Sequence, residues 1–296
     1  MKKIRITPFV IMVGIVLATA ARVYAICHTD MKTGLLFHDT ELVCNWIYYG
    51  IILLTAVGVV ISSHIDTKRG VCGSAGVKPG AKACIAVGFG LLAVVLCACY
   101  DGIDEMDALT PTGFIILADF IAAAALCIIA LCTLYSKRFS PGLGFVYILG
   151  GGYYVCRGIY CFMIRMAIVT IPEYLIDCLT VICGAVFFVI FARLFSGNGG
   201  RLTTKAFFAW GTMTCVISFS SFLGAAFAKV LPGIAERLPD VPERIVFSPN
   251  QAEYYFQSLH GIDAYHMAFP PLPNPAVGVF AAVSMLAVCF SKNAEE

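Results

Sequence analysis

The first apolar run of the chain, TPFVIMVGIVLATAARVYAIC at positions 7–27, follows the basic segment MKKIRI at positions 1–6. About 20 predominantly apolar residues are enough for an α-helix to cross the hydrocarbon core of a bilayer. The run also contains VYA at positions 23–25, which has the form of a signal-peptidase site. Residues 1–25 are therefore either a secretory signal or part of the first permanent span of a membrane protein.

Two features of this run favour a permanent span. The apolar stretch from Thr7 to Ala21 is already as long as the apolar core of a signal peptide becomes, and it continues past Arg22 to Cys27. Arg22 also lies unusually close to the cleavage point. We expect residues 1–25 to be retained, and their removal would leave the orientation of the other spans unchanged.

The composition of the whole chain indicates an integral membrane protein. Of its 296 residues, 60% are hydrophobic and 13% are charged, and the mean hydropathy is +0.88. Soluble domains carry about 25% charged residues, roughly twice this share. The predicted partner is the lipid bilayer, and a net charge of +2 gives no basic bias that would point to nucleic acid.

The apolar windows predict an all-α, polytopic transmembrane helical bundle of about eight spans, forming one integral membrane domain over residues 1–296. A Pro-rich segment, 231–274, separates the last two windows and is predicted to be an extracytoplasmic loop with a short amphipathic helix that starts at Ser248-Pro249 and stops at Gly261. The windows are 7–27, 44–63, 83–100, 113–135, 143–164, 174–195, 206–229 and 275–290.

The distribution of cations orients these spans. Of the 20 Lys and Arg residues, 13 fall in the alternate loops that lie on the side of the N-terminus. The acidic segment DGIDEMD at 101–107 falls on the other side. Because Lys and Arg favour the cytoplasmic side, we expect both termini in the cytoplasm and the protein in the plasma membrane.

Two short segments suggest an internal repeat. KACIAVG at 82–88 and KAFFAWG at 205–211 share the pattern K-A-x-x-A-x-G at the start of the third and seventh windows. Two halves of four spans with the same orientation would form a 4+4 parallel repeat, as in some transporters. Chance similarity between helices rich in Ala and Gly is the alternative.

The 14 cysteines do not form a recognisable disulfide or metal framework. No C-x-x-C pair occurs, and most of the cysteines lie inside apolar windows, where Cys acts as a small hydrophobic residue. Cys27 and Cys44 flank the first outer loop and are the one pair that could form a disulfide. The commoner state of cysteines in membrane proteins, free thiols, is the favoured alternative.

Sequence motifs of enzymes are absent, so an enzyme is the minority interpretation. The chain has no H-E-x-x-H, no G-x-S-x-G, no Walker A segment and no G-x-G-x-x-G at a strand–helix turn. Histidines and acids in the outer loops match no compact metal motif. We therefore expect no cofactor and no metal.

Charged residues inside the windows are the candidate functional residues. Ionisable side chains within spans are costly and mark ligand sites or ion-pair networks. With the orientation above, four of them lie in the outer halves of their spans, and two tyrosines share a helical stripe with one of the arginines. The candidate ligand-binding residues are Arg157, Arg22, Asp119, Asp177, Tyr153 and Tyr160. The alternative is a purely structural ion-pair network.

Two classes of function follow. The first is a permease-like protein that binds or moves a small polar solute through the candidate residues. The second is a non-transporting sensor, assembly factor or complex subunit that meets a protein partner at loop 231–274, and the lack of proline breaks within the spans favours it. A lipid-modifying enzyme that holds a metal at the acidic loop 101–107 is a weaker third.

Overall fold

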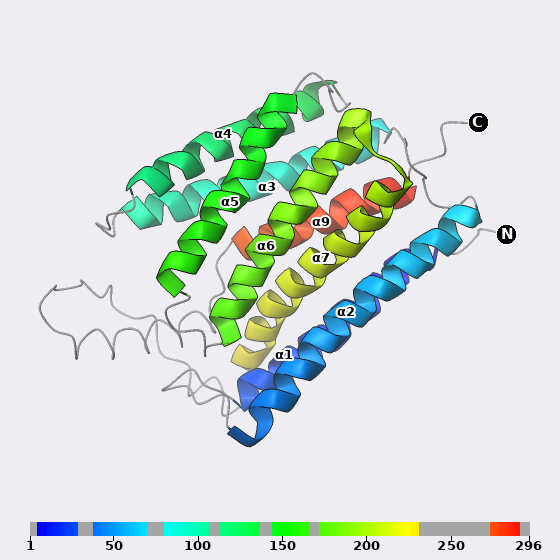
Figure 1. Cartoon of the computed structure of the whole chain (residues 1–296), viewed down its shortest axis with the longest axis vertical. Coiled ribbons are helices and arrows are strands. Elements are labelled where there is room, and N and C mark those ends of the chain that lie inside the picture. Colours follow the sequence, from blue (N-terminus) through cyan, green and yellow to red (C-terminus); the bar gives the residue numbers. More distant parts are fainter. Residues whose placement is uncertain are drawn as a thin grey trace, which may run out of the picture.

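The protein is an all-helical bundle, described here from a computed structural model (Figure 1). The structure describes residues 5–28, 38–69, 80–106, 113–136, 144–165, 172–230 and 273–290. Loop residues 231–272, with the helix expected between Ser248-Pro249 and Gly261, lie outside this part. Within these ranges the eight α-helices are α1 (Thr7–Cys27), α2 (His38–Lys68), α3 (Ala81–Met106), α4 (Gly113–Ser136), α5 (Gly144–Arg165), α6 (Pro172–Arg193), α7 (Arg201–Val230) and α9 (Pro273–Phe290), with a π-helical turn, η3 (Leu194–Asn198), after α6.

The predicted all-helical chain is confirmed, and the protein is a multi-pass membrane protein. Among the described residues, five helical stretches are long and apolar enough to cross a membrane: Thr7–Cys27, Trp46–Lys68, Ala81–Cys99, Leu175–Ser196 and Leu202–Phe227. Two further apolar helical stretches, Phe120–Ser136 and Pro275–Phe290, are shorter than these five. The number of spans beyond these five and the identity of the membrane stay predictions.

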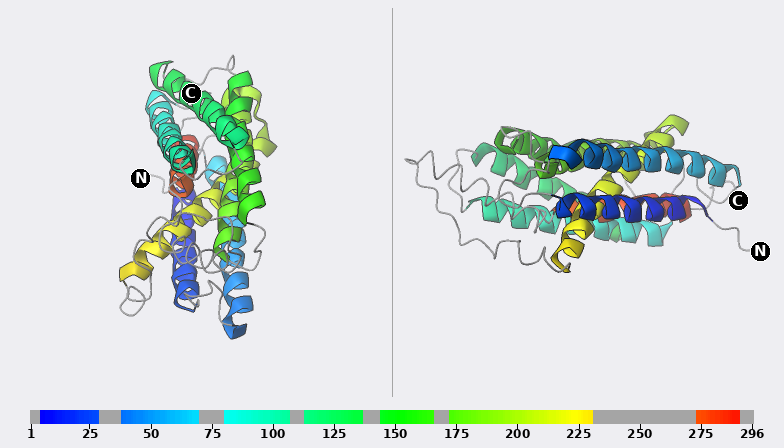
Figure 2. Two further views of the ribbon diagram at one scale, coloured as in Figure 1. Left: turned by 90° about the vertical axis from the view of Figure 1, so that its left-hand side faces the viewer. Right: turned by 90° about the horizontal axis from the view of Figure 1, so that it is seen from below.

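Six of the helices form a ring. α3 packs on α4, α4 on α5, α5 on α6, α6 on α7 and α7 on α9, and α9 closes the ring by packing on α3 (Figure 2). α1 and α2 pack on each other and both pack on α7 from outside the ring. α7 is therefore the helix that joins the α1–α2 pair to the rest of the bundle.

This arrangement bears on the 4+4 repeat. In such a repeat, the packing of α6 on α7 would have a counterpart between α2 and α3. Within the described residues, α6 packs extensively on α7, whereas α2 and α3 do not pack extensively on each other. The repeat stays a prediction.

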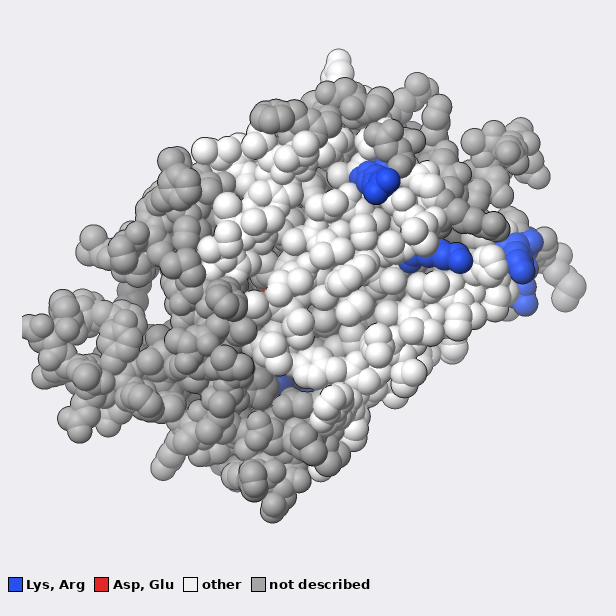
Figure 3. Space-filling view, viewed as in Figure 1, with Lys and Arg blue, Asp and Glu red and all other residues white. Residues whose placement is uncertain are grey.

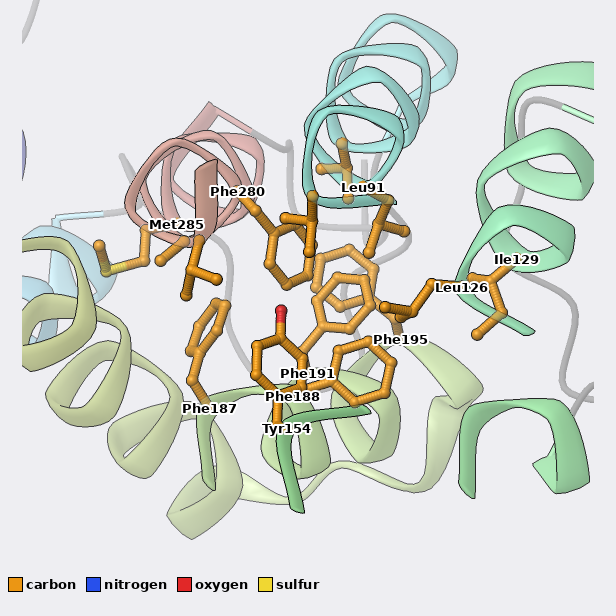
Figure 4. Packing of buried hydrophobic residues seen from close by; sticks show 14 of the residues in the cluster. Leu91, Leu126, Ile129, Tyr154, Phe187, Phe188, Phe191, Phe195, Phe280 and Met285 are labelled. Atoms are coloured by element: carbon orange, nitrogen blue, oxygen red, sulfur yellow. The ribbon is translucent and has the colours of Figure 1, made fainter. Parts of the chain in front are cut away.

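Aromatic side chains fill the interior of the ring. Phe187 and Phe191 of α6 lie edge-on to Phe280 of α9, with ring centroids 5.6 and 5.0 Å apart (Figure 4). Tyr154 of α5 lies 5.6 Å from Phe188. Such aromatic pairs stabilise a packed interior beyond the area they bury. Because α5, α6, α7 and α9 all contribute to this cluster, it fixes their relative register.

The start of α1 and the end of α9 lie at one end of the bundle (Figures 1 and 2). The Arg5 guanidinium, just before α1, lies 4.1 Å from the ring centroid of Phe290, the last residue of α9. We call this the terminal end and the opposite one the distal end. Most of the blue surface in Figure 3 lies toward the terminal end, in agreement with the cation asymmetry of the sequence.

Large apolar side chains cover the outside of the bundle. Phe9 is 68% exposed, Leu54 72% and Ile148 73%. Soluble proteins rarely leave so many large apolar side chains on a contiguous surface. Lipid is the environment that this surface requires. Tyr24 and Trp46, both exposed near the distal ends of their helices, match the aromatic residues that mark a membrane interface.

Candidate functional site

Arg22 lies in the contact between α1 and α7. The buried residues of α1 recur at helical spacing and include Gly14, Ala18 and Arg22. A methyl group at Gly224 of α7 would lie 2.6 Å from Arg22 Cγ. The aliphatic part of Arg22 therefore occupies space that only a glycine leaves open, and the residue is 6% exposed.

One turn along α7 from Gly224, a hydrogen bond joins α7 to α2. The hydroxyls of Tyr48 and Ser220 lie 2.8 Å apart, and both residues are buried. Ser220 also donates to the carbonyl of Ile217, so Tyr48 donates to Ser220. Arg22 and the Tyr48–Ser220 pair thus lie within about one helical turn of each other along α7.

The packing of α5 on α6 brings two further charges to similar depth. A methyl group at Gly158 would lie 3.7 Å from Val181 Cγ1, and one at Gly184 would lie 3.2 Å from Tyr154 Cε1. In this antiparallel register Arg157 is level with Val181. Asp177 precedes Val181 by one turn of α6, which is about 6 Å along the helix axis. Arg157 is 7% exposed and Asp177 5%, and each interacts with other groups of the protein.

The contact between α6 and α7 relates the two sets of residues. A methyl group at Gly211 would lie 2.9 Å from Phe187 Cε2. Phe187 of α6 is therefore level with Gly211 of α7. Asp177 precedes Phe187 by the same number of residues as Ser221 follows Gly211. Because the two helices are antiparallel, Asp177 is level with Ser220 and Ser221. We call Arg22, Tyr48, Arg157, Asp177 and Ser220 the distal polar layer.

The structure therefore places three of the four charged candidates in one layer of the distal half. Tyr153 is also buried and lies edge-on to Tyr154, with ring centroids 5.1 Å apart. Asp119 on α4 and Tyr160 on α5 belong to described helices, but their side chains lie outside the described part. Their membership of the layer stays a prediction.

Some buried hydroxyls in this layer and around it are satisfied by their own helix. Thr180 donates to the carbonyl of Ile176 at 2.8 Å, for example. The hydroxyl oxygens of Thr19, Tyr154 and Ser218 are buried and have no hydrogen-bond partner among the described residues. Thr19 lies one turn from Arg22 on α1, so this hydroxyl is available to a water or a solute at the depth of the layer.

A second polar centre, at the terminal end, was not predicted from the sequence. Asp66 of α2 is 1% exposed, and its Oδ2 accepts hydrogen bonds from the backbone nitrogens of Ile6 and Thr7 at 3.0 and 2.9 Å. The Thr7 hydroxyl donates to the same oxygen at 2.8 Å. Asp66 thus caps the first turn of α1 from a neighbouring helix.

The cysteines and histidines form no further centre in the described residues. Cys27 and Cys44 are both free thiols. His28 Nδ1 lies 2.9 Å from the Tyr24 carbonyl oxygen, one turn earlier on α1. Among the described side chains, no group of three or more His, Cys, Asp or Glu residues could hold a metal ion.

Comparisons with protein families, with curated proteins and with solved structures give no match for this chain. A fold alone would not specify an activity in any case. The function has to be argued from the distal polar layer itself.

Proposed function

We propose that this protein is permease-like and binds a small polar solute in the distal polar layer. The observation that supports this proposal most strongly is the burial of Arg22, Arg157 and Asp177 within helices whose outer surface is apolar. Insertion scales give a cost of about 2.5–3.5 kcal/mol for each such charge at a span centre. A solute site is a role that justifies this cost.

The chemistry of the layer suits a solute that carries a carboxylate or a similar anionic group. A guanidinium donates two parallel hydrogen bonds to a carboxylate, and Arg22 and Arg157 bracket Asp177 in depth. Asp177 offers a counter-charge for a cationic group. The unsatisfied Thr19 hydroxyl adds a donor beside Arg22. A small zwitterion or anion would therefore find complementary groups from α1, α5 and α6.

One observation favours the second candidate, a non-transporting sensor, assembly factor or complex subunit. Many transporters build their substrate sites from helices that are broken near the midplane. Each of the eight described helices, α1 to α7 and α9, runs without such a break. Binding without transport would use the same layer, with loop 231–274 as the part that meets a partner.

A panel of small solutes tests the binding proposal. The full chain in neutral lipid nanodiscs is heated in the presence of acetate, phosphate, glycine, glutamate or glucose, and the Tm is measured. We expect at least one acetate-, phosphate- or amino-acid-type probe to raise the Tm of the wild type and not that of Arg157→Gln. Val155→Gln, two residues away on the exposed face of α5, is the matched control and should keep the response.

Two results would contradict solute binding at this layer. One is a panel in which every probe leaves the wild-type Tm unchanged. The other is a probe that raises the Tm of Arg157→Gln as much as that of the wild type. Uptake of the active probe into proteoliposomes then separates the permease from the non-transporting candidate.

A further inference from the structure

The terminal end of the bundle carries a group of exposed cations. Among the described side chains, every exposed charge is a cation, and the two described acids, Asp66 and Asp177, are buried. The exposed cations are Lys68, Arg69, Lys82, Arg193 and Lys205. We call these five residues the basic surface.

Helix register places all five at the terminal end. Lys68 and Arg69 follow Asp66, which contacts the first turn of α1. Lys82 lies in the first turn of α3. Gly90 of α3 packs against Phe280 of α9, the helix that ends beside Arg5. Arg193 ends α6 directly before η3, which leads into the start of α7. The Tyr48–Ser220 hydrogen bond sets Lys205 level with Ser63, within about two turns of Lys68.

Apolar groups adjoin these cations on the outside of the bundle. Leu202, one turn before Lys205 on α7, is 80% exposed, and Phe290 at the end of α9 is 57% exposed. Side chains of this kind suit the acyl region, while the long lysine side chains reach outward to the head-group level. The surface therefore combines a lipid-facing apolar part with a cationic rim at the depth of one membrane interface.

We propose that the basic surface binds the head groups of anionic phospholipids, with Lys68 and Lys205, near the terminal ends of α2 and α7, as principal residues. Charge complementarity supports this partner, because the exposed charges among the described side chains are all positive. Basic segments next to spans attract anionic lipids in this way, and the attraction weakens as salt rises. The site is distinct from the distal polar layer, which lies at the other end of the helices.

The test compares lipid compositions with the full chain in nanodiscs. We expect phosphatidylglycerol mixed into phosphatidylcholine to raise the wild-type Tm, and high salt to reduce this rise. The double variant Lys68→Gln/Lys205→Gln should lose most of the rise, and it should fold because both side chains are exposed. Lys229→Gln, at the opposite end of α7, is the matched control and should keep the rise.

Three outcomes would overturn the proposal. The first is an unchanged wild-type Tm when phosphatidylglycerol is added. The second is an equal rise in the wild type and the double variant. The third is a rise that inorganic phosphate produces in phosphatidylcholine alone, that is as large as the phosphatidylglycerol rise, and that persists in Arg157→Gln but is lost in Lys68→Gln/Lys205→Gln, since a free anion rather than a lipid head group would then be the ligand of the basic surface.

Discussion

Asp66 of α2 accepts two hydrogen bonds from Thr7, at the start of α1, on a single carboxylate oxygen, Oδ2. The backbone nitrogen of Thr7 lies 2.9 Å from this oxygen, and the Thr7 hydroxyl lies 2.8 Å from it. The first turn of a helix leaves backbone N–H groups without intrahelical partners. In most helices a residue of the same chain segment caps them. Here the cap comes from the end of the neighbouring antiparallel helix, so it also fixes the register of α1 on α2.

Asp66→Ala should destabilise the protein more than any change to Thr7. The substitution leaves the buried donors of Ile6 and Thr7 without an acceptor, at a cost of about 1–3 kcal/mol for buried unsatisfied groups. Thr7→Ala removes only the hydroxyl bond and should cost about 1 kcal/mol, while Thr7→Ser keeps it and serves as the control. Thermal unfolding in one detergent ranks the three variants. Equal Tm values for Asp66→Ala and the wild type would show that the cap contributes nothing.

Gly224→Ala should disturb the packing of Arg22 of α1 against α7. The added methyl would lie 2.6 Å from Arg22 Cγ, so one of the two helices must shift, and overpacking of this kind costs about 1–3 kcal/mol. Gly50→Ala on α2 is the matched control, because its methyl would meet nothing within 4 Å. Adding Arg22→Ala to Gly224→Ala should recover part of the lost stability. The prediction fails if Gly224→Ala and Gly50→Ala have the same Tm.

Tyr48 and Ser220 should be energetically coupled. Hydrogen bonds between helices in membranes contribute about 0.6 kcal/mol on average by double-mutant cycles. Tyr48→Phe and Ser220→Ala each remove one partner of the bond without adding bulk. A cycle built from the two single variants and the double variant measures the coupling free energy. A coupling free energy of zero would mean that the contact contributes nothing to stability.

Phe187→Ala should be among the most destabilising single changes. Phe187 is fully buried and contacts Phe207, Phe280 and the α-carbon region of Gly211. Truncating a buried Phe to Ala costs about 3–5 kcal/mol in packed cores. Phe9→Ala, at a side chain 68% exposed, is the control and should have little effect. Comparable losses of Tm in the two variants would contradict the assignment of the ring interior as the core.

The sequence predicts the helices through their apolar segments, and α2 and α3 extend beyond their windows, 44–63 and 83–100, into polar sequence. The first window, 7–27, coincides with α1, and the window 113–135 differs from α4 by one residue. The order in which helices pack is not predictable in the same way. The contact of α9 with α3 and the position of the α1–α2 pair outside the ring depend on shape complementarity between distant segments, such as Gly90 against Phe280.

The candidate site was predictable in part for a related reason. Arg22, Arg157 and Asp177 are conspicuous because charge is rare in apolar windows, and their similar depth follows from the span boundaries. Tyr48, Ser220 and Thr19 have no such signal, since hydroxyl groups are common in spans. Asp66 is not predictable, because an acid at the end of an apolar window resembles an ordinary interface residue. Asp66 and the Thr-Pro start of α1 lie far apart in the sequence, so no local sequence pattern indicates their contact.

Accessibility of position 157 tests the central claim, a solute-accessible polar layer in the distal half, most directly. Single cysteines are introduced in a cysteine-depleted variant at Arg157, and at Val155 and Ile159 on the exposed face of the same helix. A charged, membrane-impermeant thiol reagent is then applied from the distal side of oriented vesicles. The account predicts that Arg157→Cys reacts, because water reaches the layer, while Val155→Cys and Ile159→Cys in lipid do not. An unreactive Arg157→Cys in a folded protein would contradict it.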